Sequence, residues 1–259
     1  MNHLLWKASV SLSRCRNTAT YGFALPFTYR NWWAVPLPKF GRSVALELRN
    51  GTKYLVRSGT TDLAAVNEAA ILNPYLRSPY IVLPEDATVI DIGANIGAFT
   101  VQVARRCPRG RVLAVEPVSS NVQMIEAQIA LNQLSNVLTV RAAVGATCRT
   151  TGVTGTGMTA RVTEGEGPSE VVEMITLERL MEDYAVDTLD LLKLDCEGAE
   201  WDILPAAERV LPRIRQISME FHCERGWTAV KLADWLRVRG FTVSHTGGEW
   251  NGLLWAARR

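Results

Sequence analysis

A glycine loop with an acidic entrance is the first feature of this sequence that could do chemistry. The chain reads TVIDIGANIG, in which Asp91 ends an apolar stretch and Gly93 and Gly97 follow it. Glycines at these positions permit a tight turn and a close approach of the backbone to a ligand. The spacing departs from G-x-G-x-x-G, the usual dinucleotide pattern. The loop therefore predicts a cofactor site without naming the cofactor.

A second acid, Glu116, ends the next apolar stretch, 25 residues after Asp91. An acid about 20 residues beyond a glycine loop is the expected ligand of a ribose diol. NAD needs that acid as well, but an aspartate at the entrance of the loop would repel its pyrophosphate. S-adenosylmethionine carries a sulfonium and an ammonium and no phosphate. The two acids therefore favour S-adenosylmethionine and disfavour NAD.

Candidate catalytic residues gather in two later stretches, LDCEGAE and SMEFH. Methyl transfer is an in-line displacement, in which an alcohol acceptor must also lose a proton. Asp195 closes an apolar stretch, so its partly desolvated carboxylate is the favoured general base. Glu220 or His222 would orient the acceptor, and the histidine is the alternative base. Glu197 and Glu200 have another explanation, since acids in the first turn of a helix stabilise it without chemistry.

A divalent cation is an alternative use of the same carboxylates. Asp195 and Glu220 on neighbouring strand ends would offer the hard oxygen ligands that Mg²⁺ prefers. Two carboxylates and one histidine are too few to require a metal, so a reaction without Mg²⁺ is favoured. The five cysteines include no C-x-x-C pair, which gives no indication of a zinc site.

The elements that must position these residues alternate between strands and helices from residue 87 onward. Such βαβ units predict an α/β fold with a mostly parallel sheet. The last two strands, 241–246 and 253–259, flank a GGEWNG turn and predict an antiparallel hairpin at the sheet edge. The stretch 145–169 is expected to be a loop that could hold a short β excursion. The other expected strands span residues 88–93, 111–117, 137–145, 171–175, 188–195 and 213–222. One expected helix runs from the glycine loop to residue 106, and the others span 119–132, 176–184 and 227–239.

Upstream of the core, residues 43–58 predict a hairpin around Asn50-Gly51, a strong hairpin signal. A helix with Asp62 as its N-cap is expected over 62–76. The predicted organisation has three parts: an arm at 1–42, the hairpin and helix at 43–84, and the cofactor-binding core at 85–259.

Composition and charge limit the classes of partner. The chain is 47% hydrophobic and 21% charged, with a net charge of +2, which does not indicate nucleic-acid binding. No run is long and apolar enough to span a bilayer, so a cytoplasmic protein is expected. Residues 1–46 carry basic side chains but no acid. This arm is expected to pack near the substrate, and membrane-surface contact or organelle targeting by residues 1–30 is left open.

Three stretches, VIDIGANIGAFT, AVEPVSSN and LDLLKLDCEGAEWDIL, resemble the FkbM-type methyltransferase family. The resemblance covers roughly residues 58–222, and KLDCEGAE is its family-specific part. It implies a class I methyltransferase fold: a Rossmann-like, seven-stranded, mostly parallel sheet with a C-terminal antiparallel hairpin. It also implies that S-adenosyl-L-methionine is the cofactor. The residues that would contact it are Asp91, Gly93, Asn95 and Gly97 at the methionine moiety, Glu116 at the ribose, and Pro117 and Ala142 at the adenine.

The acceptor is expected to be a hydroxyl. Amino-directed base methyltransferases carry an N-P-P-Y-like turn after the fourth strand, and this chain has Leu-Asp-Cys-Glu-Gly there. Asn73-Pro74-Tyr75 precedes the first core strand and does not fill that place. The resemblance implies a sugar, glycolipid or natural-product hydroxyl. Tyr29, Trp32, Trp33 and Tyr75 could stack on it or serve in packing. A protein or RNA methyltransferase and a non-catalytic cofactor-binding scaffold are the alternatives.

Overall fold

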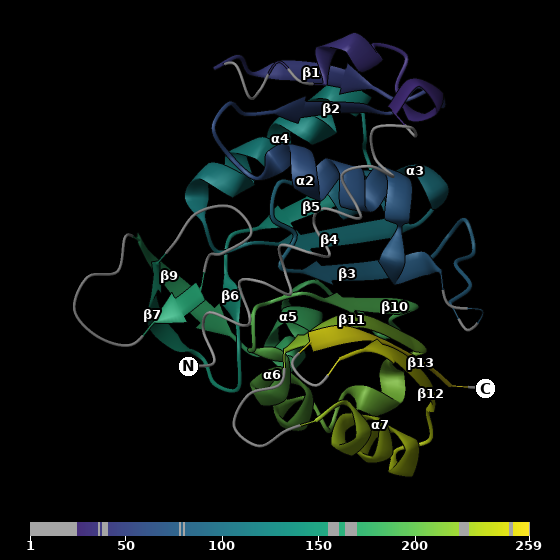
Figure 1. Cartoon of the computed structure of the whole chain (residues 1–259). Helices are drawn as coiled ribbons and strands as arrows, with labels where there is room; N and C mark the ends of the chain where they lie inside the picture. Colours follow the sequence, from purple (N-terminus) through teal and green to yellow (C-terminus); the bar gives the residue numbers. More distant parts are fainter. Residues whose placement is uncertain are drawn as a thin grey trace, which may run out of the picture. The chain divides into compact units, whose positions relative to one another are not determined.

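The computed structural model describes residues 25–258, except 36, 38–40, 78, 80, 155–160, 164–169, 223–227 and 249–250. Two compact units make up the chain, Met1–Leu72 and Asn73–Arg259 (Figure 1). Their boundary falls inside the segment 43–84, which the sequence predicts as one part. The predictions made for residues 1–24 lie outside the described residues.

The first unit contains the predicted hairpin, in which β1 (Val44–Glu47) pairs antiparallel with β2 (Lys53–Val56). This prediction is confirmed. Tyr29 is fully buried in this unit, and its hydroxyl donates to Oδ1 of Asn67 at 2.7 Å. It is therefore a packing residue, whereas Trp32 and Trp33 in the short helix η1 (Trp32–Ala34) are exposed.

The expected single helix over 62–76 is wrong. Helix α2 spans only Asp62–Asn67. A π-helical turn η3 (Glu68–Leu72) and a 3₁₀ turn η4 (Pro74–Leu76) follow it. Asn73 interrupts the helix with a left-handed backbone (φ 44°) ahead of a proline that lacks an amide donor. The N-cap is Thr61, and Asp62 is the first helical residue, whose buried carboxylate accepts from Arg57 at 2.8 Å.

The second unit is built on a seven-stranded sheet in the order β12-β13-β11-β10-β3-β4-β5. The five strands β11 to β5 run parallel, and β13 is antiparallel to both β11 and β12. This confirms the predicted mostly parallel sheet with its C-terminal hairpin. The strands span β3 (Thr88–Ile92), β4 (Arg111–Val115), β5 (Val137–Val140), β10 (Leu191–Leu194), β11 (Gln216–His222), β12 (Thr242–Gly247) and β13 (Asn251–Ala257).

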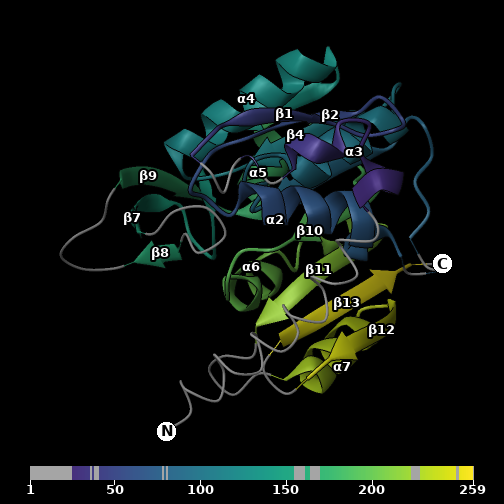
Figure 2. The ribbon, with the colours of Figure 1, turned by 45° about the horizontal axis from the view of Figure 1, so that its top comes forward.

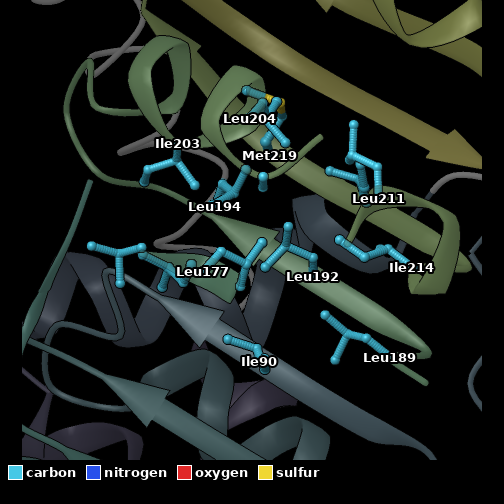
Figure 3. Close-up of a cluster of buried hydrophobic side chains, with 14 of the residues drawn as sticks. Ile90, Leu177, Leu189, Leu192, Leu194, Ile203, Leu204, Leu211, Ile214 and Met219 are labelled. Atoms are coloured by element: carbon cyan, nitrogen blue, oxygen red, sulfur yellow. The ribbon is translucent and has the colours of Figure 1, made fainter. Parts of the chain in front are cut away.

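Helices cover both faces of this sheet (Figures 1 and 2). Helices α3 and α4 pack on one face through residues such as Phe99 and Ile125. Helices α5, α6 and α7 pack on the other, where Leu177, Ile203 and Leu204 surround Ile90 and Leu192 of the central strands (Figure 3). The helices span α3 (Ala98–Arg106), α4 (Ser119–Asn132), α5 (Leu177–Asp183), α6 (Glu200–Ala206), η6 (Leu211–Arg213) and α7 (Ala229–Val238).

A small second sheet, in the order β6-β9-β7-β8, stands apart from the main sheet in the same unit (Figure 2). Its strands span β6 (Ala143–Val144), β7 (Arg149–Thr154), β8 (Arg161–Thr163) and β9 (Glu170–Ile175). The β excursion that the sequence left open in 145–169 is therefore present as β7 and β8. Among the described residues, no helix is long and apolar enough to cross a membrane.

Candidate active site

The predicted site residues lie at or just beyond the carboxyl ends of strands, and most of these strands are neighbours in the sheet. Strands β11, β10, β3 and β4 are parallel, so their carboxyl ends meet at one edge, where α/β sheets bind ligands. The loop after β3 and the loop after β10 touch at this edge. A Cβ atom placed on Gly93 would lie 1.8 Å from the carbonyl oxygen of Asp195. Only a glycine permits this approach, so the cofactor loop and the candidate base are in direct contact.

The glycine loop is shaped by left-handed backbone at Gly93, Asn95 and Gly97, with φ of 73°, 52° and 79°. The amide of Gly93 donates to the carbonyl of Val115 in β4, and Gly97 is the N-cap of α3. Oδ1 of Asn95 is buried and has no hydrogen-bond partner in the described part of the chain. A buried acceptor without a donor is costly unless a ligand supplies one. The ammonium of a bound methionine moiety would be such a donor.

Glu116 lies at the end of β4 with only 4% of its surface exposed. One carboxylate oxygen accepts from the amide of Asn95 at 2.8 Å, and the other accepts from Val118 and Asn121. A carboxylate offers about four lone-pair sites, so the oxygen facing Asn95 can accept one more hydrogen bond. Burial raises the pKa of Glu116 to about 7, although these hydrogen bonds act in the opposite direction. The position and the spare acceptor site fit a ribose hydroxyl.

Asp91 is fully buried, and its charge is matched within the protein. Oδ2 accepts from the hydroxyl of Thr100 at 2.6 Å, and the ammonium of Lys193 lies 2.9 Å from Oδ1. The charge of Asp91 is thus balanced by Lys193 and is not left over to attract a cationic cofactor. Lys193 also donates to the carbonyl of Gly93 at 3.0 Å, so the ion pair holds the loop. A direct contact between Asp91 and the methionine moiety stays a prediction.

Asp195 lies at the end of β10, with 28% of its side chain exposed. The hydroxyl of Tyr75 donates to its Oδ2 at 2.8 Å, and the ammonium of Lys193 lies 3.9 Å from the same oxygen. Burial acts to lower the pKa of Lys193, but Asp91 and Asp195 outweigh it and raise that pKa. Asp195 is therefore a partly exposed carboxylate beside a permanent cation.

His222 lies among three carboxylates at the end of β11. Its Nε2 is 3.9 Å from both Glu197 and Glu220, and its Nδ1 is 3.7 Å from the buried Glu200. Burial acts to lower the pKa of His222, but the carboxylates outweigh it and raise the pKa to about 9. The imidazole is therefore a cation at neutral pH and lacks the lone pair that a base needs. The structure thus brings Glu220 and His222 together, while the contacts of Asp195 run to Tyr75 and Lys193.

The two acids after β10 differ in position. Glu197 lies in the turn before α6 with a left-handed backbone (φ 54°), so the expectation that it belongs to the first helical turn is wrong. Glu200 is in that turn, and its carboxylate accepts from the amides of Cys196 and Gly198. Glu200 therefore has the structural role that its place in the sequence indicates.

Pro117 and Ala142 lie beyond the ends of β4 and β5. Pro117 is partly buried and directly precedes the N-cap of α4. Ala142 is buried, and its amide donates to the carbonyl of Val140 at 3.2 Å. Both positions border the strand ends next to Glu116, and their contact with adenine stays a prediction.

The sequence does not indicate Lys193 as a site residue, and it indicates Tyr75 only as a residue that could stack on the acceptor or pack, not as a partner of Asp195. A lysine between leucines in a buried strand must meet a carboxylate, and this signal was available. The sequence could not identify which carboxylate it meets, because the pairing of Lys193 with Asp91 follows from the β10–β3 register. Tyr75 precedes the core in sequence, and only the tertiary structure brings it to Asp195. Among the residues that the structure describes, no group of three or more His, Cys, Asp or Glu side chains is arranged to hold a metal ion.

Comparison with known proteins extends this picture. The model of the Methyltransferase FkbM domain matches residues 91–243, which include the glycine loop, Glu116 and the Asp195–His222 region. AMB antimetabolite synthetase AmbE of Pseudomonas aeruginosa is 28% identical over 83% of this chain, which spans only 12% of AmbE. Methyltransferase sdnD of Sordaria araneosa is 24% identical, over 65% of this chain and 78% of its own length.

Two solved structures show a likeness in fold. Precorrin-6y C5,15-methyltransferase of Geobacter metallireducens has a TM-score of 0.45 and 14% identity, covering 70% of this chain and 84% of its own. M. capricolum TrmK, in complex with S-adenosyl-homocysteine, has a TM-score of 0.45 and 8% identity, covering 69% and 65%. The family match spans more than half of the sequence and confirms the resemblance seen in its motifs. The chain belongs to the FkbM methyltransferase family and is an S-adenosylmethionine-dependent methyltransferase.

Proposed function

We propose that this chain is an O-methyltransferase that acts on a hydroxyl of a sugar, glycolipid or natural product, with Asp195 as the general base. One observation carries the proposal: Asp195 is a partly exposed carboxylate whose backbone touches the glycine loop at Gly93. A base placed against the cofactor loop lies where the acceptor must approach. The similarity to an antimetabolite synthetase agrees with a natural-product acceptor.

The cofactor would be held by the loop from Gly93 to Gly97, with Glu116 at the ribose and Pro117 and Ala142 near the adenine. When bound, S-adenosylmethionine supplies an electrophilic methyl group on a cationic sulfur. Asp195 accepts the proton of the acceptor hydroxyl as the oxygen becomes the nucleophile. Glu220, beside the His222 cation, orients the acceptor. His222 cannot compete as the base at neutral pH because it is already protonated.

The surroundings of Asp195 support a reaction without Mg²⁺. The ammonium of Lys193 lies 3.9 Å from its carboxylate, and a divalent cation at the same oxygen would be repelled by that charge. Dialysis against a chelator should leave turnover unchanged. Loss of turnover that Mg²⁺ restores would instead make Asp195 and Glu220 ligands.

The base assignment is tested by Asp195→Asn in single-turnover methylation, with cofactor binding measured beside it. General-base catalysis contributes roughly 10²–10⁴-fold, so the rate should fall by about that factor while the affinity for S-adenosylhomocysteine changes little. Asp187→Asn makes the same chemical change at a fully exposed position before β10 and should leave the rate unchanged. Near-full turnover in Asp195→Asn, or a loss explained by cofactor binding, would contradict the assignment.

The acceptor class is tested separately. A panel of sugars, glycolipids and hydroxylated natural products, together with RNA and protein extracts, is incubated with labelled S-adenosylmethionine. Label and a mass increase of one CH₂ should appear on a small hydroxylated acceptor. Label on RNA or protein alone would overturn the proposed acceptor class.

A further inference from the structure

Tyr75 belongs to a segment that lies outside the family match, which begins at residue 91. The segment is nevertheless fixed to the strands that form the site. The carbonyl of Pro74 accepts from the indole of Trp255 in β13 at 3.0 Å, and the carbonyl of Tyr75 accepts from the hydroxyl of Ser218 in β11 at 2.7 Å. Both donors are buried. The backbone of this short segment is therefore held in place before any ligand binds.

The side chain of Tyr75 is fixed as firmly as its backbone. Only 5% of the residue is exposed, and its ring packs edge-on against Phe99 of α3 at a centroid distance of 5.5 Å. The ammonium of Lys193 lies over the ring at 5.1 Å, within the range of a cation–π interaction. These contacts restrict the phenol to one position, in which its hydroxyl donates to Oδ2 of Asp195.

This arrangement makes the two oxygens of Asp195 different. Within the described residues, both contacts of the carboxylate, with Tyr75 and with Lys193, are made by Oδ2. An oxygen that already accepts a hydrogen bond from the phenol and faces a cation is the poorer site for a new proton. Oδ1 is left as the oxygen that can receive one.

We propose that Tyr75 is a positioning residue, which holds Asp195 by Oδ2 and turns Oδ1 towards the acceptor hydroxyl. This inference rests on the proposed role of Asp195 as the base. As the acceptor oxygen bonds to the methyl carbon, its O–H bond breaks and the proton passes to Oδ1. The electrons of the former carbon–sulfur bond stay with sulfur, which becomes neutral. Tyr75 keeps its own proton throughout.

A double-mutant cycle tests this coupling. Tyr75→Phe removes only the hydroxyl and keeps the ring between Phe99 and Lys193. Because a hydrogen bond to a charged group is lost, kcat should fall by about 10–100-fold. The KM of the acceptor and the affinity for S-adenosylhomocysteine, measured by calorimetry, should change little. In an Asp195→Asn background, the same substitution should cost nothing further, because the base that Tyr75 positions is already absent.

Tyr184→Phe is the matched control, since Tyr184 lies at the end of α5 and its ring faces Arg111. Calorimetry and thermal unfolding show that each variant retains a folded cofactor site. An equal loss of kcat from Tyr75→Phe in both backgrounds overturns the inference, and so does unchanged kcat in the single variant. If Asp195→Asn keeps its turnover, the base assignment fails and this inference fails with it. A loss of turnover in Asp195→Asn with none in Tyr75→Phe overturns the role of Tyr75 alone.

Discussion

The ammonium of Lys193 lies 2.9 Å from Oδ1 of Asp91, and the two side chains are 4% and 0% exposed. Their strands are parallel neighbours, and the register places the two residues directly opposite each other. Lys193 also donates to the carbonyl of Gly93. The pair therefore buries two opposite charges in the centre of the sheet. Through the hydrogen bond to Gly93, it also fixes the start of the cofactor loop.

Removal of one partner from this pair should be costly. Lys193→Met leaves the Asp91 charge buried without its cation, and such a change typically costs about 3–5 kcal/mol of unfolding free energy. The double variant Asp91→Asn/Lys193→Met should recover much of the loss, because no buried charge remains. Urea denaturation measures both. Lys231→Met on the exposed face of α7 is the control and should change stability by less than about 0.5 kcal/mol. A single variant as stable as the wild type would contradict the prediction.

Cofactor affinity should depend on pH through Glu116, whose pKa burial raises to about 7. Ribose hydroxyls donate to the ionised carboxylate, so below that pH the group must lose a proton before it can bind. The affinity for S-adenosylhomocysteine should therefore fall as pH drops below about 7, approaching tenfold per pH unit. Above it, the affinity should level off.

Glu116→Gln is the matched variant for this measurement. It should bind S-adenosylhomocysteine more weakly, because charged hydrogen bonds are lost. The pH dependence that remains in Glu116→Gln belongs to the ligand and to other groups, so the difference between the two profiles isolates Glu116. Parallel profiles for wild type and variant would show that Glu116 does not take part.

The mostly parallel sheet and the C-terminal hairpin could be predicted from the sequence because their signals are local. Runs such as Leu191–Leu194 are apolar enough to identify buried strands, and alternating helices force a parallel sheet. The interruption of the helix after Asp62 was not predicted. Asn73 adopts a left-handed backbone conformation, although the residues before it have a helical pattern. The backbone of a single asparagine is too weak a local signal to reveal such a break.

Site residues that end core strands could be predicted from the sequence. Contacts between residues far apart in the sequence could not. Glu116 and Asp195 could be placed because each closes an apolar strand. The hydrogen bond between Tyr75 and Asp195 joins residues 120 positions apart, and nothing in the local sequence of either one indicates it. The cationic state of His222 depends likewise on three carboxylates from two separate stretches.

His222 should titrate well above neutrality in the folded protein. Burial acts to lower its pKa, but Glu200, Glu220 and Glu197 outweigh it and raise the pKa to about 9 from 6.5. Because the folded-state value is the higher one, this interaction stabilises the fold fully below about pH 6.5 and is lost as pH rises through about 9. NMR of the imidazole resonances should show a midpoint near 9, with the exposed His245 assigned by His245→Gln. A midpoint near 6.5 would return His222 to the candidates for the base.

Two matched substitutions can separate the stability cost of a clash between residue 93 and Asp195 from the cost of a left-handed backbone. Gly93 and Gly59 have nearly the same φ, 73° and 71°, but a Cβ on Gly59 meets nothing within 4 Å. Gly59→Ala therefore reports the cost of the left-handed backbone alone, about 1–2 kcal/mol. Gly93→Ala adds a clash with the Asp195 carbonyl, a backbone atom that cannot turn aside, and should cost about 1–3 kcal/mol more in urea denaturation. Because the loop must move away from Asp195, the affinity for S-adenosylhomocysteine and the turnover should also fall in Gly93→Ala and not in Gly59→Ala. Equal losses in the two variants would mean that the loops after β3 and β10 are not in contact.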